Sequence, residues 1–289
     1  MMGLPAIFIA LSILSSAEER LRVVEVDTSA VQGQAFSARV KVKPLMSFDQ
    51  VALELFETGA PCHKTGENPD SDSDWTCLAA VPADAKEGMY NVRILLNGEK
   101  AFASTAVIVP YGFPTYALNL SAEKKALYKA KGREKEVEKI RGTLATETPE
   151  RLWEDFVFPV VGKMEGEYGE RRTVDGRLKT GYHRGVDWAA PEGNPVLAAA
   201  DGVVLLEGRY AEEGRMIILD HGQGVTTAYL HLSKILVDEG DEVEAGDVIG
   251  KVGSTGVSTS PHLHFGVYIH GTPLDPVYWF KEYPNLLRK

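Results

Sequence analysis

Three short stretches decide how the C-terminal half of the chain folds: Gly181-Tyr-His-Arg-Gly-Val-Asp187, Ala228-Tyr-Leu-His-Leu232 and Ser260-Pro-His-Leu-His-Phe-Gly-Val267. Four of the seven histidines of the 289-residue chain lie in them, together with one aspartate. Polar and apolar residues alternate in these stretches, which is typical of a β-strand with one buried face. We therefore expect strands whose polar faces carry the candidate functional residues His183, Asp187, His231, His262 and His264.

The spacing within the first and last stretches brings polar side chains to a common face. Successive side chains of a strand point to opposite faces, so His262 and His264 share one face, opposite an apolar core face. An extended run from His183 to Asp187 likewise places both residues on one face, and Gly185 leaves that face clear between them. Two pairs of potential ligands are therefore expected on strand faces.

The middle stretch is expected to follow the same alternation. Thr227, Tyr229 and His231 would share one face of the strand, and the apolar residues between them would form the other face. This pattern predicts a third strand with a histidine on its polar face.

Imidazole and carboxylate groups are, with thiolate, the ligands that zinc takes from proteins. A catalytic zinc usually keeps three protein ligands and one open position for water, so five candidate groups exceed what the metal needs. A single histidine is more often an ordinary core or surface residue, but three stretches that each place a histidine opposite an apolar face favour a metal site. Some of the five residues should then act beside the metal without binding it.

The three stretches resemble the motifs of the LytM/lysostaphin-type zinc metallopeptidases, also called murein endopeptidases. The motifs of that family are His-x-x-x-Asp, Tyr-x-His-Leu and His-x-His. They stand here in the same order as His183-Arg-Gly-Val-Asp187, Tyr229-Leu-His231-Leu and His262-Leu-His264. Glycine-rich framing such as Gly253-Ser-Thr-Gly256 also matches, and the resemblance covers roughly Phe156 to Phe280.

The resemblance implies one zinc per chain, bound by His183, Asp187 and His264, and it implies that His231 and His262 are catalytic. One of these two would take a proton from the attacking water, and the other would hydrogen-bond the developing oxyanion. The sequence leaves open which residue does which. The family fold is a mostly antiparallel sheet whose groove floor holds the metal, and the implied substrate is a peptide bond in the stem peptides or cross-bridges of peptidoglycan.

Two alternatives belong to other functional classes. A non-catalytic family member would bind the cell wall or regulate other wall hydrolases, but such relatives lose metal ligands, and all three are present here. The run from Val237 to Val248 resembles the hairpin of biotinyl and lipoyl carrier domains, yet it lacks their Asp-Lys pair. A Gly-x-Ser-x-Gly elbow and a His-Glu-x-x-His motif are also absent from the sequence.

Composition and charge limit the classes of partner that we expect for the protein. The chain has a net charge of −10, so neither nucleic acid nor an anionic membrane surface is an expected partner. Residues 1–17 carry no charged side chain, and their apolar run is too short to span a bilayer, which is typical of a signal peptide. We expect an exported protein of the periplasm or cell envelope, or one released outside the cell, without a membrane span in the mature chain. Peptidoglycan peptides are the expected partners, with regulatory envelope proteins as further candidates.

The sequence predicts a mainly β protein with three parts after the signal peptide. Residues 18–114 alternate short strands and turns, which favours an antiparallel β-sandwich that resembles immunoglobulin-like modules. Residues 115–155 form a charged connector with one or two helical pieces, capped at Ser121 and interrupted at Gly132, and a short helix is expected after Thr148. Residues 156–289 form the predicted antiparallel β-sheet zinc peptidase domain.

Four further residues are interpreted as structural. Cys62 and Cys77 are the two cysteines of the chain, and with a signal-like start they favour a disulfide. His221 and His270 lie next to turn glycines and show no ligand spacing. We expect neither histidine to take part in the chemistry.

Overall fold

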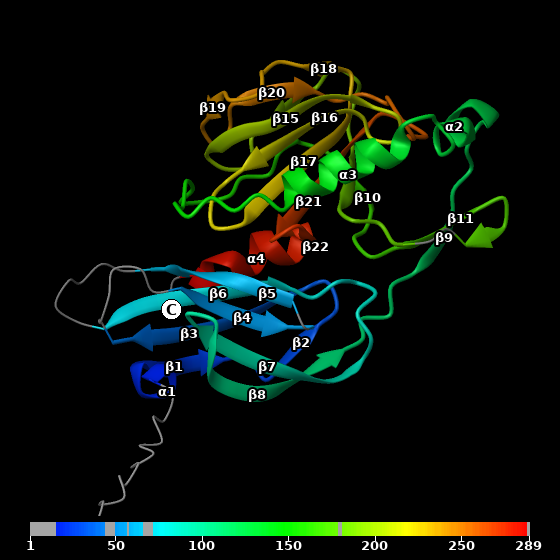
Figure 1. Ribbon diagram of the computed structural model, residues 1–289. Helices are drawn as coiled ribbons and strands as arrows, with labels where there is room; N and C mark the ends of the chain where they lie inside the picture. Colours follow the sequence, from blue (N-terminus) through cyan, green and yellow to red (C-terminus); the bar gives the residue numbers. More distant parts are fainter. Residues whose placement is uncertain (1–15, 44–49, 57, 66–71, 179–180, 288–289) are drawn as a thin grey trace, which may run out of the picture. The chain divides into compact units, whose positions relative to one another are not determined.

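The computed structural model describes residues 16–43, 50–56, 58–65, 72–178 and 181–287. Strands dominate these residues, which confirms the predicted mainly β class (Figure 1). Most of the predicted signal peptide, 1–17, lies outside the described residues. Among the described residues, no helix is long and apolar enough to cross a bilayer.

The chain divides into two compact units. One comprises Met1–Val26, Ala38–Cys77 and Asn91–Ser104, and the other comprises Asp27–Ser37, Leu78–Tyr90 and Thr105–Lys289. The limits of the two units fall within several of the N-terminal strands, so no boundary between the units coincides with residue 114. The predicted division of the chain at residues 18–114, 115–155 and 156–289 stays a prediction.

The N-terminal strands form an eight-stranded sheet in the order β1-β3-β6-β5-β4-β7-β8-β2. The elements of this region are α1 (Ser16–Arg20), β1 (Leu21–Val26), β2 (Ser29–Val31), β3 (Ala35–Val42), β4 (Val51–Leu55), β5 (Thr58–Lys64), β6 (Ser73–Ala80), β7 (Gly88–Leu96) and β8 (Glu99–Val109). The described pairings are antiparallel, except that β2 runs parallel to β8. The likeness to immunoglobulin modules stays a prediction.

The predicted disulfide is confirmed and joins two neighbouring strands. Cys62 on β5 and Cys77 on β6 are directly opposite each other in the antiparallel register. Because the bridge closes a loop with a sequence separation of 15, the chain-entropy estimate of its stabilisation is about 3 kcal/mol.

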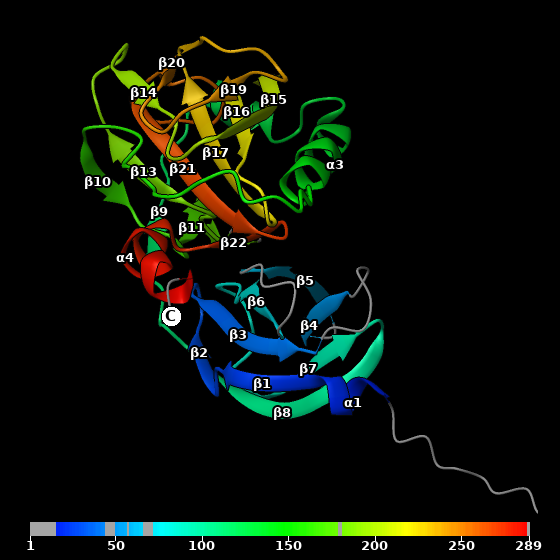
Figure 2. The same ribbon diagram turned by 90° about the vertical axis from the view of Figure 1, so that its left-hand side faces the viewer.

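The C-terminal region is built around a second large sheet, in the order β10-β13-β21-β17-β16-β15-β19, with β22 paired to β21 (Figure 2). Its strands are β10 (Lys163–Gly166), β13 (Val186–Ala189), β15 (Gly202–Tyr210), β16 (Gly214–Asp220), β17 (Val225–Leu232), β19 (Glu242–Val243), β21 (His262–Ile269) and β22 (Thr272–Leu274). All of its described pairings are antiparallel, as the sequence predicts.

Two three-stranded sheets and the helix α4 also belong to the C-terminal region. They are β14-β20-β18, made of β14 (Pro195–Leu197), β18 (Lys234–Ile235) and β20 (Val248–Lys251); β12-β11-β9, made of β9 (Thr115–Ala117), β11 (Arg171–Val174) and β12 (Arg177–Leu178); and α4 (Pro276–Leu287). In the last sheet, β9 of the predicted connector runs parallel to β11. The connector therefore supplies a strand to the C-terminal region.

The two faces of the large sheet are both covered by apolar side chains. Leu263 and Phe265 of β21 point into the main core, together with their cross-strand neighbours Trp188 and Tyr229. The opposite face carries a second, smaller core under the connector. Because cross-strand partners share a face, this second face is also the one that carries His264 of β21.

Two helices form from the connector, with the interruption that the sequence predicts. They are α2 (Ala122–Leu127) and α3 (Arg133–Leu144). Ser121 caps α2 by accepting a hydrogen bond from the Lys124 backbone N–H, and Gly132 begins α3 with a left-handed φ of 87°. The helix predicted after Thr148 is wrong: the Thr148 hydroxyl hydrogen-bonds the Asp220 carboxylate, so it does not cap a helix.

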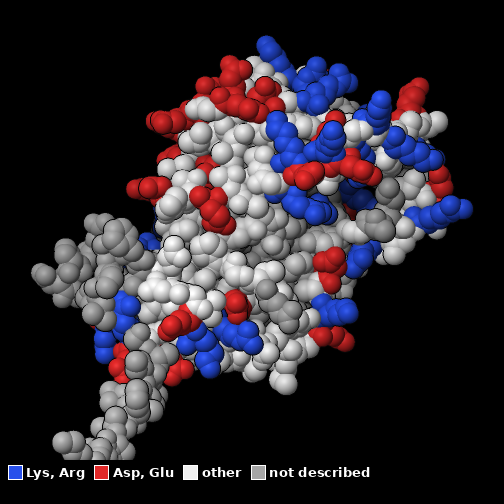
Figure 3. Space-filling view, in the orientation of Figure 1, with Lys and Arg blue, Asp and Glu red and all other residues white. Residues whose placement is uncertain are grey.

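The connector helix α3 lies across the large sheet and closes the second core (Figure 1). Ile140 and Leu144 are its buried residues, and they pack against side chains of the sheet: Leu206, Met216, Ile218, Ala228 and Tyr268. Its remaining surface is charged, and basic and acidic side chains intermingle over α2 and α3 (Figure 3). Only part of the connector is therefore the solvated polar link that its composition suggests.

This packing predicts that α3 contributes directly to the stability of the sheet. Leu144→Ala should lower the free energy of unfolding by about 2 to 4 kcal/mol, because it removes buried methyl groups and leaves a cavity. Glu138→Ala, at an exposed position of the same helix, should change it by less than about 0.5 kcal/mol. Urea unfolding of the full chain measures both values, and equal effects would contradict the packing of α3.

Candidate metal and catalytic site

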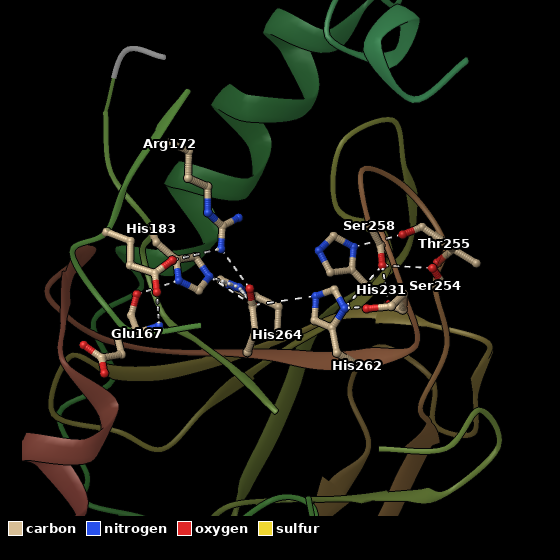
Figure 4. Close-up of polar contacts among 12 residues, drawn as sticks. Glu167, Arg172, His183, His231, Ser254, Thr255, Ser258, His262 and His264 are labelled. Atoms are coloured by element: carbon tan, nitrogen blue, oxygen red, sulfur yellow. Dashed lines mark hydrogen bonds and ion pairs between the residues drawn. The ribbon is translucent and has the colours of Figure 1, made fainter. Parts of the chain in front are cut away.

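Two neighbouring strands position three potential metal ligands. Asp187 on β13 and His264 on β21 are directly opposite each other in the antiparallel register, so their side chains share a face. His183 lies just before β13, and its backbone N–H donates to the Glu170 carbonyl. We call His183, Asp187 and His264 the ligand cluster, and Figure 4 labels its two histidines.

The atoms of the ligand cluster converge closely. His183 Nε2 lies 2.8 Å from His264 Nδ1 and 3.0 Å from Asp187 Oδ1, and His264 Nδ1 lies 2.8 Å from the same oxygen. The predicted extended run differs in one respect, because the strand begins at Val186 and His183 precedes it. The expected pairing of His183 with Asp187 is nevertheless present.

Glycines at two positions allow the strands to approach the cluster. A Cβ atom at Gly185 would overlap the carbonyl oxygen of Phe265 and lie 2.9 Å from His264 Nε2. A Cβ atom at Gly166 would lie 2.8 Å from Asp187 Oδ2. A larger residue at either position would displace a ligand or its strand.

The protonation of His183 follows from its backbone partner. His183 Nδ1 lies 2.8 Å from the carbonyl oxygen of Glu167, which only accepts, so in the neutral ring Nδ1 carries the proton and Nε2 presents a lone pair. Asp187 Oδ1 is also an acceptor, and His264 Nδ1 is the one remaining atom that could donate. Three electronegative atoms thus meet around at most one proton, which is the arrangement that a cation stabilises.

Burial and the neighbouring side chains together set the charge states of His264 and Asp187. Desolvation lowers the pKa of His264 to about 4, which keeps its imidazole neutral near pH 7. Burial by itself would raise the pKa of Asp187, but the adjoining His183 and His264 outweigh it and hold the pKa well below its usual value. Neutral imidazoles and an ionised carboxylate are the forms that bind a metal.

Two more histidines, His231 and His262, lie beside the cluster, and we call them the histidine pair. Their ring centroids are 4.9 Å apart, and His262 Nε2 lies 3.7 Å from Asp187 Oδ1. The structure therefore brings together all five residues that the sequence singles out, and Figure 4 labels the four histidines among them.

His231 reaches this position by a route that the sequence pattern did not predict. Tyr229 points into the main core and is fully buried, so regular alternation would also direct His231 into that core. An irregularity in the β16–β17 register inserts one extra residue, and His231 adopts a left-handed φ of 65°. The predicted common polar face of Thr227, Tyr229 and His231 is therefore wrong, since the bulge turns His231 to the face of His264.

Backbone carbonyls also fix the rings of the histidine pair. His231 Nδ1 lies 2.9 Å from the Thr255 carbonyl, and His262 Nδ1 lies 2.8 Å from the Ser260 carbonyl. Each Nδ1 therefore donates its proton, and each Nε2 presents a lone pair when the ring is neutral. Burial, with a further contribution from His262, lowers the pKa of His231 to about 3.

A hydroxyl-rich loop supports this side of the site. Ser258 Oγ lies 3.3 Å from His262 Nδ1 and 2.9 Å from Ser254 Oγ. The connector holds the same loop, because Lys124 Nζ donates to the carbonyls of Ser254 and Gly256, on either side of Thr255. In the sequence, the polar composition of this loop is the one feature that indicates its role in supporting the site.

Arg172 is the charged side chain of the site that the sequence analysis missed. Its Nη2 atom donates to Asp187 Oδ2 at 2.8 Å, while Asp187 Oδ1 faces the histidines. It comes from β11, a short strand outside the three motif stretches. In the sequence Arg172 is one of two adjacent arginines in a charged segment, and their spacing does not indicate a functional role.

The two histidines interpreted as structural lie outside this cluster. His221 Nδ1 donates to the Asp201 carbonyl, and its Nε2 accepts from the Thr227 hydroxyl at 2.7 Å. His270 contacts the Glu147 carboxylate. Neither residue contacts any of the five site residues in the described contacts.

Comparisons with known proteins find a family model that matches the segment containing this site. Residues 181–276 match the model of Peptidase family M23. The DD-carboxypeptidase/endopeptidase Mpg of Neisseria meningitidis serogroup B is 50% identical over 95 residues, which cover 33% of this chain and 22% of that protein. The peptidoglycan DD-endopeptidase ShyA of Vibrio cholerae serotype O1 is 38% identical over 120 residues, covering 41% of this chain and 28% of that protein.

A solved structure extends the likeness beyond the matched segment. A Pseudomonas aeruginosa protein assigned to peptidase M23 aligns with a TM-score of 0.61 over 86% of this chain and 94% of that chain, at 22% identity, which shows a shared fold. The matches cover only about a quarter of the length of the two curated relatives. The resemblance predicted from the three motifs is confirmed: the C-terminal region carries a peptidase M23 domain.

The geometry predicts one metal ion per chain, held by the ligand cluster. His264→Ala should lose the ion, because it removes the nitrogen that lies nearest to both other ligands. His262→Ala should keep it. Metal analysis of the purified full-length variants tests this, and full occupancy and affinity in His264→Ala would overturn the ligand set.

The buried His221 predicts a loss of stability in acid. Burial lowers its pKa in the folded state to about 4, whereas an unfolded histidine has a pKa of about 6.5. Between these values the unfolded state binds the proton and the folded state does not, so stability falls as pH drops from 6.5 towards 4, by roughly 3 kcal/mol at most. Urea midpoints from pH 7.5 to 5 should fall less steeply in His221→Gln than in the wild type; parallel curves would refute this role.

Proposed function

We propose that this protein is a zinc-dependent endopeptidase that hydrolyses peptide bonds in the stem peptides or cross-bridges of peptidoglycan. The observation that carries the proposal is the convergence of the ligand cluster beside two histidines whose Nε2 atoms are oriented by backbone carbonyls. A metallopeptidase needs a metal position and a proton carrier close to each other, and this site holds residues suited to both.

The donor set of the ligand cluster fits zinc. Two imidazole nitrogens and one carboxylate oxygen are ligands that zinc accepts at catalytic sites, where a fourth position stays open. His183, Asp187 and His264 would hold the ion. When bound, zinc supplies Lewis acidity that activates water and polarises a carbonyl group.

The histidine pair would move the proton. A neutral His231 or His262 accepts a proton at Nε2, because Nδ1 is already committed to a carbonyl. The same ring, once protonated at Nε2, becomes a donor to the developing oxyanion or to the leaving amine. The arrangement allows either histidine to be the base, so the two roles stay unassigned.

The substrate class rests on the relatives. One is named a DD-carboxypeptidase/endopeptidase and the other a peptidoglycan DD-endopeptidase. They match this chain over 95 and 120 residues, and the residues that match the family model, 181–276, contain the ligand cluster and the histidine pair. This supports peptidoglycan peptides as the substrate.

Export of the protein is part of the proposal. The apolar, uncharged start of the sequence resembles a signal peptide, and the Cys62–Cys77 disulfide is a bond that forms in oxidising compartments. Both features support a location in the periplasm, in the envelope or outside the cell, where peptidoglycan is accessible.

Digestion of purified peptidoglycan by the full-length protein tests this function. Mass analysis should show fragments released by cleavage of peptide bonds with intact glycan linkages. A chelator should stop the release, and added zinc should restore it. A zinc-loaded, folded protein that releases no fragments would overturn the proposal in favour of a binding or regulatory protein.

The histidine pair should separate chemistry from metal binding. His231→Ala and His262→Ala should each keep zinc and lose turnover by a factor of about 100 to 1000, since each removes a group that acts in the transition state. The double variant should be little worse than the poorer single one. The control is His270→Asn, because His270 lies outside the site and asparagine tolerates its left-handed φ. Wild-type turnover in His231→Ala or His262→Ala would show that the replaced histidine takes no part in the mechanism.

A further inference from the structure

Arg172 places a positive charge at the edge of the ligand cluster. The side chain comes from β11, whose register with β9 pairs Arg172 with Tyr116. Figure 4 shows its guanidinium reaching down towards the cluster from above. The charge therefore lies close to the position where a scissile bond would be attacked.

Holding Asp187 uses only part of this side chain. A guanidinium has five N–H donors, and the described contacts of Arg172 use Nη2 alone, at 2.8 Å from Asp187 and 3.9 Å from Glu170. The Arg172 side chain is 29% exposed, whereas that of Glu170 is 7% exposed and accepts the Glu167 backbone N–H. Glu170 is thus held within the protein, while Arg172 keeps donors for an acceptor from solution.

The charges of the site favour an anionic acceptor. Asp187 and Arg172 balance each other, so a divalent ion in the cluster would leave the site positive even with Glu170 nearby. A guanidinium binds a carboxylate through two parallel hydrogen bonds and by attraction of opposite charges. A carboxamide is neutral and has only one acceptor oxygen, so it binds a guanidinium less tightly. A residue of extended chain spans only about 3.5 Å, so the acceptor within reach belongs to a residue next to the scissile bond.

We propose that Arg172 binds a substrate carboxylate on a residue that flanks the scissile bond, and that this contact selects acidic stem peptides over their amidated forms. The inference rests on the proposed function, because it names the substrate class of that same site. It assigns to Arg172 a role beyond positioning Asp187.

Calorimetry on the full-length, zinc-loaded protein tests the inference. The probe is a stem-peptide analogue in which a ketomethylene group replaces the scissile amide, prepared with free carboxylates and with carboxamides at the same positions. The wild type should bind the acid form about 10 to 100 times more tightly than the amide form, as expected for charge-assisted hydrogen bonds.

A matched pair of variants separates this contact from general charge effects. Arg172→Gln should bind both forms with the affinity that the wild type has for the amide form. Arg171→Gln carries the same change of charge on the adjacent residue, whose side chain points to the opposite face of β11, and should keep the preference. Zinc content is measured for each variant, so that a loss of metal through Asp187 is recognised separately.

Three results would overturn the inference: equal binding of the two forms by the wild type, a preserved preference in zinc-loaded Arg172→Gln, or an equal loss in Arg171→Gln. Failure of the proposed function is distinguishable, because the binding preference is measured without cleavage. Cleavage without an acid preference would refute the role of Arg172 alone, and an acid preference without cleavage would refute the peptidase alone.

Discussion

The site depends on one cross-strand pair, Asp187 opposite His264. The antiparallel register of β13 and β21 sets this pair, and the core residues that alternate with it hold the register, since a slip by one residue would turn both side chains into the core. His183 then completes the cluster from the chain just before β13. Packing of the apolar face thus determines where the polar atoms meet.

Backbone carbonyls provide the second constraint. Those of Glu167, Ser260 and Thr255 each accept the Nδ1 proton of one histidine, which turns three Nε2 atoms towards the same region. The loop that carries Thr255 is in turn held by Lys124 of the connector. Residues that no motif contains therefore decide the orientation of the residues that the motifs do contain.

The sequence predicted most of the site because its signals are local. Alternation on β21 correctly placed His262 and His264 on one face, and the spacing of His183 and Asp187 correctly brought them together. The same rule failed for His231, because a bulge depends on the register with β16, which the sequence of β17 does not encode by itself. Arg172 was missed for a similar reason: its place follows from tertiary pairing.

The connector shows the same limit at the level of the fold. Ser121 and Gly132 marked the ends of its helices correctly, since capping and positive φ are local properties. Ile140 and Leu144, which pack α3 onto the sheet, are surrounded in the sequence by charged residues. The composition of the connector therefore suggested a solvated link. The second face of the sheet is therefore part of the folded peptidase region and needs the connector to cover it.

X-ray absorption spectroscopy of the zinc-loaded protein at the zinc edge tests the central claim most directly, because it reads the ligands of the metal without reference to activity. The account predicts a four-coordinate ion with two imidazole nitrogens and oxygen ligands in the remaining positions. Three or more imidazole ligands, or a six-coordinate shell of oxygen atoms, would contradict it, because either result would place the metal outside the cluster of His183, Asp187 and His264.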